Sequence, residues 1–275
     1  MDSPVKFNSD GISLAGDFTR RDGETKKRLP GIVVAHGFAG ARYPALAEHL
    51  ASLGYGVLSF DFRGYGKSAG VRGTVLPHEQ VSDIKNAVTW LSAQPEIDPN
   101  RIAVIGSSLG GSIAIMAAAE DKRINALVSG CPLGHGDSAL RSQYDTQEKF
   151  EAFMKKVEDI KRRNGKLARF EIVFIPENLR RNLPPGTPME FTADTVHGFL
   201  ALNPLDVIAS IAPRPLYIIH ADDDHVVPVK DAYDLKARAG VGCDLEIVPK
   251  GDHFIFGLKP IIEKIGTWLK EKFPP

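Results

Sequence analysis

The sequence predicts a doubly wound α/β fold with a mostly parallel central sheet. Short runs rich in Val, Ile and Leu recur along the 275 residues, and most are continuous rather than alternating, as in strands covered on both faces. Segments with helical spacing of apolar residues separate these runs. Strands that alternate with helices are typical of a parallel sheet whose ligands bind beyond the carboxyl ends of the strands.

The expected strands begin with an antiparallel hairpin at the N-terminus. VKF and ISLAGDFT flank Asn8-Ser9-Asp10-Gly11, and Asp-Gly is a strong hairpin-turn signal. The later strands are expected at residues 31–35, 56–61, 101–105, 126–130, 215–220 and 244–248.

The expected helices lie between the later strands. One precedes Gly54, a typical helix stop; another runs over 109–119, and an amphipathic helix ending in TWLKEKF closes the chain. An apolar stripe marks the helix before Gly54, by Leu46, Leu50 and Leu53. A second stripe, by Val81, Ile84, Val88 and Leu91, predicts a further helix between the strands at 56–61 and 101–105.

Composition narrows the classes of partner. Lys plus Arg and Asp plus Glu both total 34, which gives no basic surface for nucleic acid or anionic membranes, so we expect a small-molecule partner. The chain begins without a signal-peptide pattern and has no apolar run long enough for a membrane span, which predicts a cytoplasmic protein. Cys131 and Cys243 are expected to be buried free thiols. Homo-oligomer formation stays open.

A cluster of small residues follows the strand expected at 101–105. Gly106-Ser107-Ser108-Leu109-Gly110 fits G-x-S-x-G, in which a tight turn between strand and helix exposes the central serine. Glycines flank that serine because a side chain there would collide with the neighbouring strand or helix. Ser107 lies off the centre of the pattern, and Ser112 falls inside the helix. Ser108 is therefore the candidate nucleophile.

Two nucleotide-binding patterns are incomplete. GYGKS at 64–68 supplies the second half of a Walker A motif, but Asp61 stands where its first glycine belongs. Gly106 and Gly111 have Walker spacing, yet Ser112 occupies the lysine position, and the same stretch lacks G-x-G-x-x-G. We therefore expect no phosphate-binding loop and no organic cofactor.

A serine nucleophile needs a base and an acid that orients it, and on this scaffold they follow in the order Ser, Asp or Glu, His. His225 and His253 come late enough, and His253 lies in a loop after the last expected strand, so it is the candidate base. Asp252 reads as a turn residue. The acid lies among Asp222, Asp223 and Asp224, which spacing does not separate.

The same three carboxylates, with His220 and His225, raise the alternative of a metal site. Neither a glycine-bearing calcium loop nor an H-E-x-x-H pattern accompanies them, so we expect no metal.

Acyl transfer also needs donors for the oxyanion. His36-Gly37-Phe38-Ala39-Gly40 follows the strand at 31–35, and its turn suits a backbone N–H aimed into the site. The expected oxyanion hole consists of the N–H groups of Phe38 and Leu109. His36 is expected to be structural, bonding the backbone of the loop.

These motifs together resemble the α/β-hydrolase superfamily: HGF at 36–38, DFRGYGKS at 61–68, GSSLGG at 106–111, HADDDHVVP at 220–228 and GDHF at 251–254. The resemblance covers most of residues 1–132 and 205–275, the expected hydrolase core. The family pattern His-Gly-x-x-Asp-x-x-Val-Pro implies Asp224 as the acid, with Asp222 as the alternative, and Ala221 replaces its glycine. Serine at 108 implies the serine branch, nearest to carboxylesterases such as feruloyl and cinnamoyl esterases.

Residues 133–204 exceed what one crossover helix requires, and we expect them to form a lid over the serine. FEIVFIP at 170–176 predicts an additional strand, and 184–188 a rigid turn rich in proline. A helix with one apolar face is expected from Phe150, Phe153, Met154, Val157 and Ile160.

The resulting prediction is a serine hydrolase of carboxylic esters, with Ser108, His253 and Asp224 as its catalytic triad. Thioesters, amides or peptides, and C–C bonds beside a ketone are alternatives, since the same triad serves them all. A non-catalytic ligand receptor is the alternative from a different class, and turnover that depends on Ser108 separates the two.

Overall fold

A computed structural model describes residues 2–21, 28–165, 169–171, 183 and 187–275. Eight strands form one central sheet in the order β1-β2-β4-β3-β5-β6-β9-β10. The pairs β1–β2 and β2–β4 are antiparallel, and every later pair is parallel, as predicted. The strands are β1 (Asp2–Ser9), β2 (Ile12–Thr19), β3 (Leu29–Ala35), β4 (Gly56–Phe60), β5 (Ile97–Ser107), β6 (Ile124–Gly130), β9 (Leu216–Ala221) and β10 (Cys243–Val248).

The N-terminal hairpin closes at the predicted Asp-Gly turn. Asp10 and Gly11 both have positive φ, 51° and 87°, as the central residues of a type I′ turn require. The side chain of Asn8 accepts a hydrogen bond from the N–H of Gly11 at 2.9 Å and supports the same turn.

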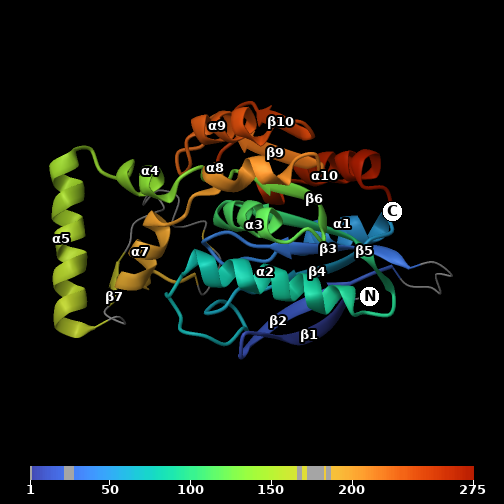
Figure 1. The fold of residues 1–275 in the computed structure, drawn as a ribbon, viewed down its shortest axis with the longest axis horizontal. Helices are drawn as coiled ribbons and strands as arrows, with labels where there is room; N and C mark the ends of the chain where they lie inside the picture. The colour runs from blue at the N-terminus through green and yellow to red at the C-terminus, as the bar shows by residue number, and fades with distance from the viewer. Residues whose placement is uncertain (1, 22–27, 166–168, 172–182, 184–186) are drawn as a thin grey trace.

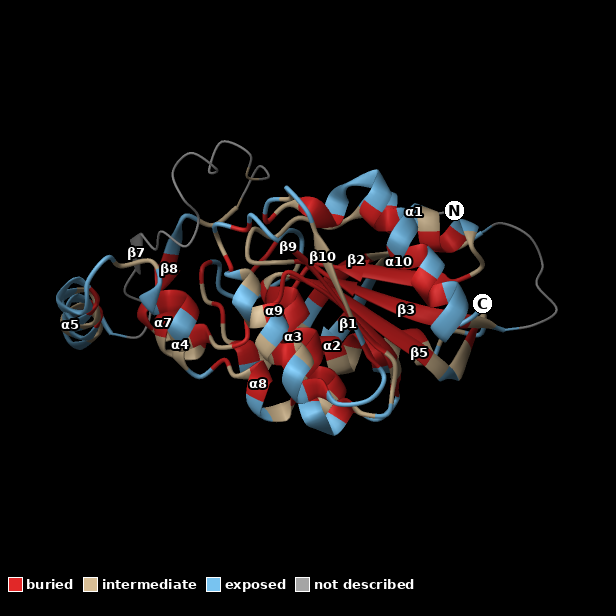
Figure 2. Ribbon diagram, turned by 90° about the horizontal axis from the view of Figure 1, so that it is seen from above, coloured by how far each residue is buried: buried red, intermediate tan, exposed pale blue. Residues whose placement is uncertain are grey.

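Helices cover both faces of the sheet and give two hydrophobic clusters (Figure 2). The cluster on one face includes α1 (Pro44–Ser52) and α10 (Lys259–Lys272). The cluster on the other face includes α2 (Pro77–Ser92), α3 (Leu109–Glu120) and α9 (Val229–Ala239). This two-sided cover explains the continuous apolar strands. The predicted stripe of α2 is buried, at Val81, Ile84, Val88 and Leu91.

Most of the segment after β6 lies at the end of the molecule opposite the two termini, whereas its last two turns, residues 204–211, pack against α3 (Figure 1). Its elements are α4 (Gly136–Arg141), α5 (Gln147–Asn164), β7 (Arg169–Glu171), β8 (Glu190–Thr192), α7 (Ala193–Leu200), α8 (Pro204–Val207) and a 3-10 turn (Ile208–Ile211). The predicted apolar face of α5 buries Phe150 and Val157, while the helix stands farthest from the sheet (Figure 1). Leu140 and Phe199 from this segment share the cluster of α2 and α3.

Only part of the strand predicted at 170–176 lies within the described residues. β7 pairs antiparallel with β8 through Phe170 and Phe191, and residues 172–176 lie outside the description. The predicted proline turn also falls largely outside it, at 184–186. Within the described part of the chain, no helix combines the length and apolar character that crossing a bilayer requires.

A buried ion pair joins the loop after β4 to α2 and the hairpin. The side chain of Asp83 is 0% exposed and pairs with the Arg63 guanidinium at 2.7 Å. Asp83 also accepts hydrogen bonds from the Ser9 hydroxyl at 2.6 Å and from the backbone N–H of Arg63 at 3.2 Å. These contacts fix the loop that carries Phe62, whose N–H bonds the ring of His36 beside the expected oxyanion turn.

Replacing Asp83 by Asn should therefore destabilise the fold. The change leaves the guanidinium of Arg63 without its buried charge partner, and the free energy of unfolding should fall by about 3 kcal/mol. Glu120→Gln is the matched control, because it breaks the exposed Lys85–Glu120 pair and should cost less than about 0.5 kcal/mol. Urea unfolding at pH 7 measures both changes, and equal effects would contradict the prediction.

Candidate active site

Ser108 occupies a strained turn between β5 and α3. Its backbone lies at φ 54° and ψ −125°, a region that residues with side chains rarely adopt. A Cβ on Gly106 would meet the carbonyl oxygen of Gly110 at 2.2 Å, and a Cβ on Gly110 would meet that of His36 at 2.2 Å. The glycines are thus required by close backbone contact, as the sequence pattern predicts.

The two neighbouring serines have other partners. The Ser107 hydroxyl bonds the hydroxyl of Tyr43, a half-buried residue, and loss of solvent around that hydroxyl raises the pKa of Tyr43. The Ser112 hydroxyl accepts from the N–H of Leu133 at 2.9 Å, so it is held by backbone, as expected for a serine inside the helix.

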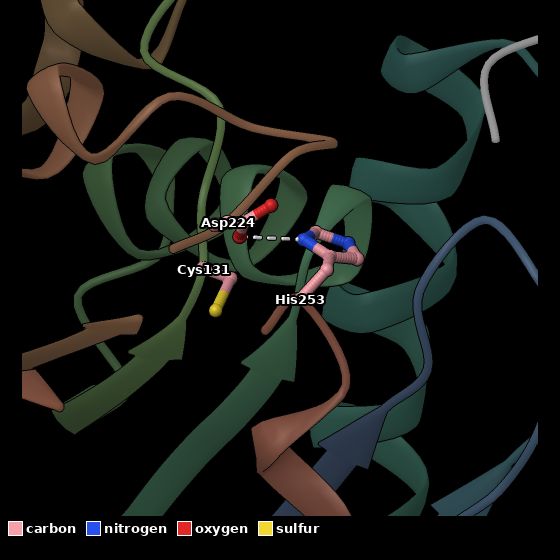
Figure 3. Close-up of side chains that lie close together, drawn as sticks. All are labelled: Cys131, Asp224 and His253. Carbon is pink, nitrogen blue, oxygen red and sulfur yellow. Dashed lines mark hydrogen bonds and ion pairs between the residues drawn. The ribbon is translucent and has the colours of Figure 1, made fainter. Parts of the chain in front are cut away.

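A continuous hydrogen-bond chain runs from Ser108 to His253 to Asp224. Ser108 Oγ lies 2.8 Å from His253 Nε2, and His253 Nδ1 lies 2.7 Å from Asp224 Oδ2. Figure 3 shows the second of these contacts. The three residues follow β5, β10 and β9, whose parallel carboxyl ends meet at one edge of the sheet.

The carboxylate of Asp224 has three hydrogen-bond partners, and the ring of His220 lies beside it. Oδ1 accepts from the N–H groups of Val226 and Val227, both at 2.8 Å, and Oδ2 faces His253 and His220. Burial alone would raise the pKa of Asp224, but the hydrogen bonds from His220, His253 and the backbone outweigh it and hold this pKa well below its usual range. The group is therefore ionised at neutral pH.

The neighbouring carboxylates point elsewhere. Asp222 and Asp223 are exposed, and Asp223 lies 3.3 Å from the exposed His225. Asp252 accepts from the N–H of Phe254 at 2.8 Å and serves the turn, as expected. Of the three adjacent carboxylates, the structure brings Asp224 to His253.

Cys131 lies beside this pair at the end of β6 (Figure 3). Its Sγ, a carboxyl oxygen of Asp224 and a ring nitrogen of His253 lie within 4.8 Å of one another. Burial, together with the charge of Asp224, raises the pKa of the Cys131 thiol well above its ordinary value. The thiol is thus a neutral neighbour of the carboxylate. Cys243 is also a buried free thiol, so the expectation for both cysteines is confirmed.

The turn after β3 brings Phe38 to the serine. A Cβ on Gly37 would meet Ser108 Cβ at 3.0 Å, a tight contact, so glycine favours this close approach. The carbonyl oxygen of Gly37 lies 2.7 Å from His36 Nδ1 and accepts from the N–H of Gly40 at 3.1 Å. In a trans peptide the N–H points opposite the C=O, so these bonds fix the direction of the Phe38 N–H.

The tautomer of His36 follows from its partners. Nε2 accepts from the N–H of Phe62 at 3.0 Å, so Nδ1 carries the proton and donates to the carbonyl of Gly37. Burial lowers the pKa of His36 and keeps the ring neutral. The expected structural role of His36 in the loop is confirmed.

A cavity of about 180 Å³ opens at Ser108 and His253. The described residues that line it include no Asp, Glu, Lys or Arg, so its walls carry no fixed charge. Phe38 and Leu109 line it together with side chains from the segment after β6: Leu133, Ala139, Gln143 and Phe199. The sequence pattern did not identify these four, because they reach the serine only through tertiary packing.

Aromatic contacts join the expected oxyanion turn to the same segment. The ring of Phe38 lies 4.5 Å from that of Phe191 and 5.4 Å from that of Phe199, measured between ring centroids. Offset and edge-to-face arrangements of this kind stabilise aromatic pairs. The residue that supplies one expected oxyanion donor is thus packed against β8 and α7.

Comparisons with known proteins give the family. Thiohydrolase aneE of Aspergillus aculeatus is 42% identical over 136 residues, which are 48% of this chain and 42% of that protein. The chain spans about half the length of the first curated relatives that it matches, between 42% and 56%.

Solved structures share the fold across nearly the whole chain. Hypothetical protein PA2218 of Pseudomonas aeruginosa superposes with a TM-score of 0.87 at 24% identity, covering 99% of this chain and 94% of that one. Est1E of Butyrivibrio proteoclasticus, solved with ferulic acid bound, has a TM-score of 0.72 at 22% identity over 98% and 100% of the two chains. A model of the alpha/beta hydrolase family matches residues 32–260, and this chain therefore belongs to that family.

Proposed function

We propose that this protein is a serine hydrolase of carboxylic esters, in which Ser108, His253 and Asp224 form the catalytic triad. The observation that carries the proposal is the hydrogen-bond chain of 2.8 Å and 2.7 Å from the serine hydroxyl to a buried, ionised carboxylate. An imidazole held in this way accepts the proton of a serine hydroxyl, which makes the oxygen a nucleophile.

In the proposed reaction, Ser108 Oγ attacks the ester carbonyl while its proton passes to His253 Nε2. The N–H groups of Phe38 and Leu109 stabilise the oxyanion of the tetrahedral intermediate. The intermediate then collapses, the C–O bond of the ester breaks, and His253 gives the proton to the departing alcohol. Water, deprotonated by His253, attacks the acyl-enzyme, and release of the acid restores Ser108.

The cavity supports a substrate whose group near Ser108 is apolar and uncharged. Its lining offers no cation for a carboxylate and no carboxylate for an amine within the described residues. Burying a charged group there would be costly, since no opposite charge compensates it. We infer that the segment 133–204 acts as a lid, because Leu133, Ala139 and Phe199 form part of this apolar wall.

Thioesters are the second candidate substrates. Two relatives, aneE and apmlB, are named thiohydrolases, and apmlB is 26% identical over 84% of this chain. The proposed triad would cleave a thioester by the same steps, with a thiol in place of the alcohol. Parallel assays on ester and thioester pairs with the same acyl group decide between the two.

Replacing Ser108 by Ala should abolish hydrolysis. A series of p-nitrophenyl esters, from acetate to long acyl chains plus an aryl acyl ester, and matched thioesters measure the effect. We expect kcat to fall by about 10⁴-fold or more, because the nucleophile is lost. Ser107→Ala is the matched control and should retain turnover. If Ser108→Ala hydrolyses these substrates as wild type does, the proposed triad is wrong.

Asp224→Asn should lower kcat by about 10⁴-fold, since an amide no longer holds His253 in the required tautomer. Asp222→Asn removes an exposed carboxylate two residues away and should leave kcat within about twofold. Comparable losses in the two variants would argue against Asp224 as the acid.

The same substitution should change the pH dependence of stability. The pKa of Asp224 is lowered in the folded protein, so its ionisation contributes stability that is complete above about pH 5 and is lost as pH falls towards the folded value. The stability advantage of wild type over Asp224→Asn should therefore shrink between about pH 5 and pH 3 in urea unfolding. The Asp222→Asn variant corrects for the change in net charge.

Ala139→Phe should shorten the acyl chains that the enzyme accepts. Ala139 is 5% exposed and lines the cavity from α4, so a larger side chain fills the space beside Ser108. We expect kcat/KM for long-chain esters to fall about tenfold or more relative to acetate. Ser138→Ala, on the same helix, is the control. An unchanged chain-length profile in Ala139→Phe would show that the acyl group lies elsewhere.

A further inference from the structure

A second histidine, His220, contacts the carboxylate of Asp224. His220 lies in β9, four residues before the aspartate, and its side chain is 0% exposed. Its Nε2 lies 3.3 Å from Asp224 Oδ2 and 3.0 Å from the carbonyl oxygen of Val227. Asp224 Oδ2 is also the atom that faces His253 Nδ1, so one oxygen is shared by two imidazoles.

The partners of His220 fix its tautomer. A carbonyl oxygen and an ionised carboxylate both only accept, so Nε2 must carry the proton. Nδ1 is buried and has no hydrogen-bond partner among the described residues, so a proton there would be a buried, unsatisfied donor. The Nε2–H group is therefore the hydrogen-bond donor of the His220 ring.

Val227 closes this arrangement into a clamp. Its N–H donates to Asp224 Oδ1 at 2.8 Å, while its carbonyl oxygen accepts from His220, which also faces Asp224 Oδ2. Oδ1 of Asp224 is thus held by the backbone of Val227, and Oδ2 contacts the His220 ring that the same residue's carbonyl orients. Rotation of the carboxylate would break contacts at both oxygens.

Three other titratable groups face this clamp: Asp231, which interacts electrostatically with His220, Cys131 and His253. Asp231 on α9 is largely buried, and burial raises its pKa while its carboxylate accepts from the N–H of Gly134 at 2.8 Å. Cys131 is a neutral thiol on the side of β6. His253 lies across the shared oxygen.

We propose that His220 is a positioning residue, which holds the carboxylate of Asp224 in the orientation that His253 needs and limits how strongly that carboxylate retains a proton on His253. This inference rests on the proposed function, because it assigns His220 a part in the same triad. Without the ring N–H of His220, whose Nε2 lies 3.3 Å from Oδ2, the negative charge of that oxygen would interact with His253 alone. Protonated His253 would then be stabilised, and it does not act as a base.

The test compares His220→Met, which removes the donor at similar size, with His220→Gln, whose amide N–H reaches a similar point. In His220→Met we expect the acidic limb of the kcat/KM profile to move to higher pH by about one unit and kcat to fall about tenfold, with KM little changed. His220→Gln should restore both towards wild type. Thermal unfolding shows whether each variant is folded.

Two outcomes would overturn the inference. One is a folded His220→Met variant with the kcat and acidic limb of wild type. The other is a loss of equal size in both variants with an unmoved limb, which indicates a purely structural residue. If the Met variant does not fold, His220→Asn replaces it, because its shorter amide does not reach the carboxylate.

A further measurement separates this inference from the proposed function. Absence of hydrolysis in wild type, together with absence of labelling of Ser108 by a fluorophosphonate, would overturn the proposed function. Titration of the His253 ring by NMR needs no substrate, so it tests the positioning role of His220 even if no hydrolysis is found. A higher titration midpoint in His220→Met than in wild type and His220→Gln supports the positioning role, and identical midpoints contradict it.

Discussion

The strained turn at Ser108 is the constraint on which the rest of the site depends. A residue with a side chain is held at φ 54°, which costs about 1 to 3 kcal/mol, and such strain persists only where surrounding structure determines it. Here β5 is buried between β3 and β6, and α3 packs on the same sheet. The close contacts of Gly106 and Gly110 allow the strand and helix to meet at this angle.

Parallel strand order brings the remaining groups to that turn. β3, β5, β9 and β10 all run in the same direction, so the residues that follow them emerge at one edge although 217 positions separate His36 from His253. Each group is then oriented by its own contacts. Asp224 is held by backbone N–H groups and His220, and the Phe38 peptide is held through the carbonyl of Gly37.

Much of this arrangement was predictable because it is local in sequence. Continuous apolar runs locate the buried strands, and the G-x-S-x-G spacing locates the turn. The choice among Asp222, Asp223 and Asp224 was not predictable from spacing, because adjacent carboxylates differ only in how the loop after β9 turns. The contacts of Phe38 with Phe191 and Phe199 depend on packing between segments more than 150 residues apart, which no local pattern records.

Phe38 has a consequence for how enzymes of this kind diverge. Its backbone is the proposed oxyanion donor, while its ring is part of the cavity wall and packs against Phe191 and Phe199. Changes in that aromatic packing therefore act on the shape of the pocket and on the donor together. A lineage that acquires a new substrate by altering β8 or α7 must retune its rate at the same step, so selectivity and turnover evolve as one linked trait.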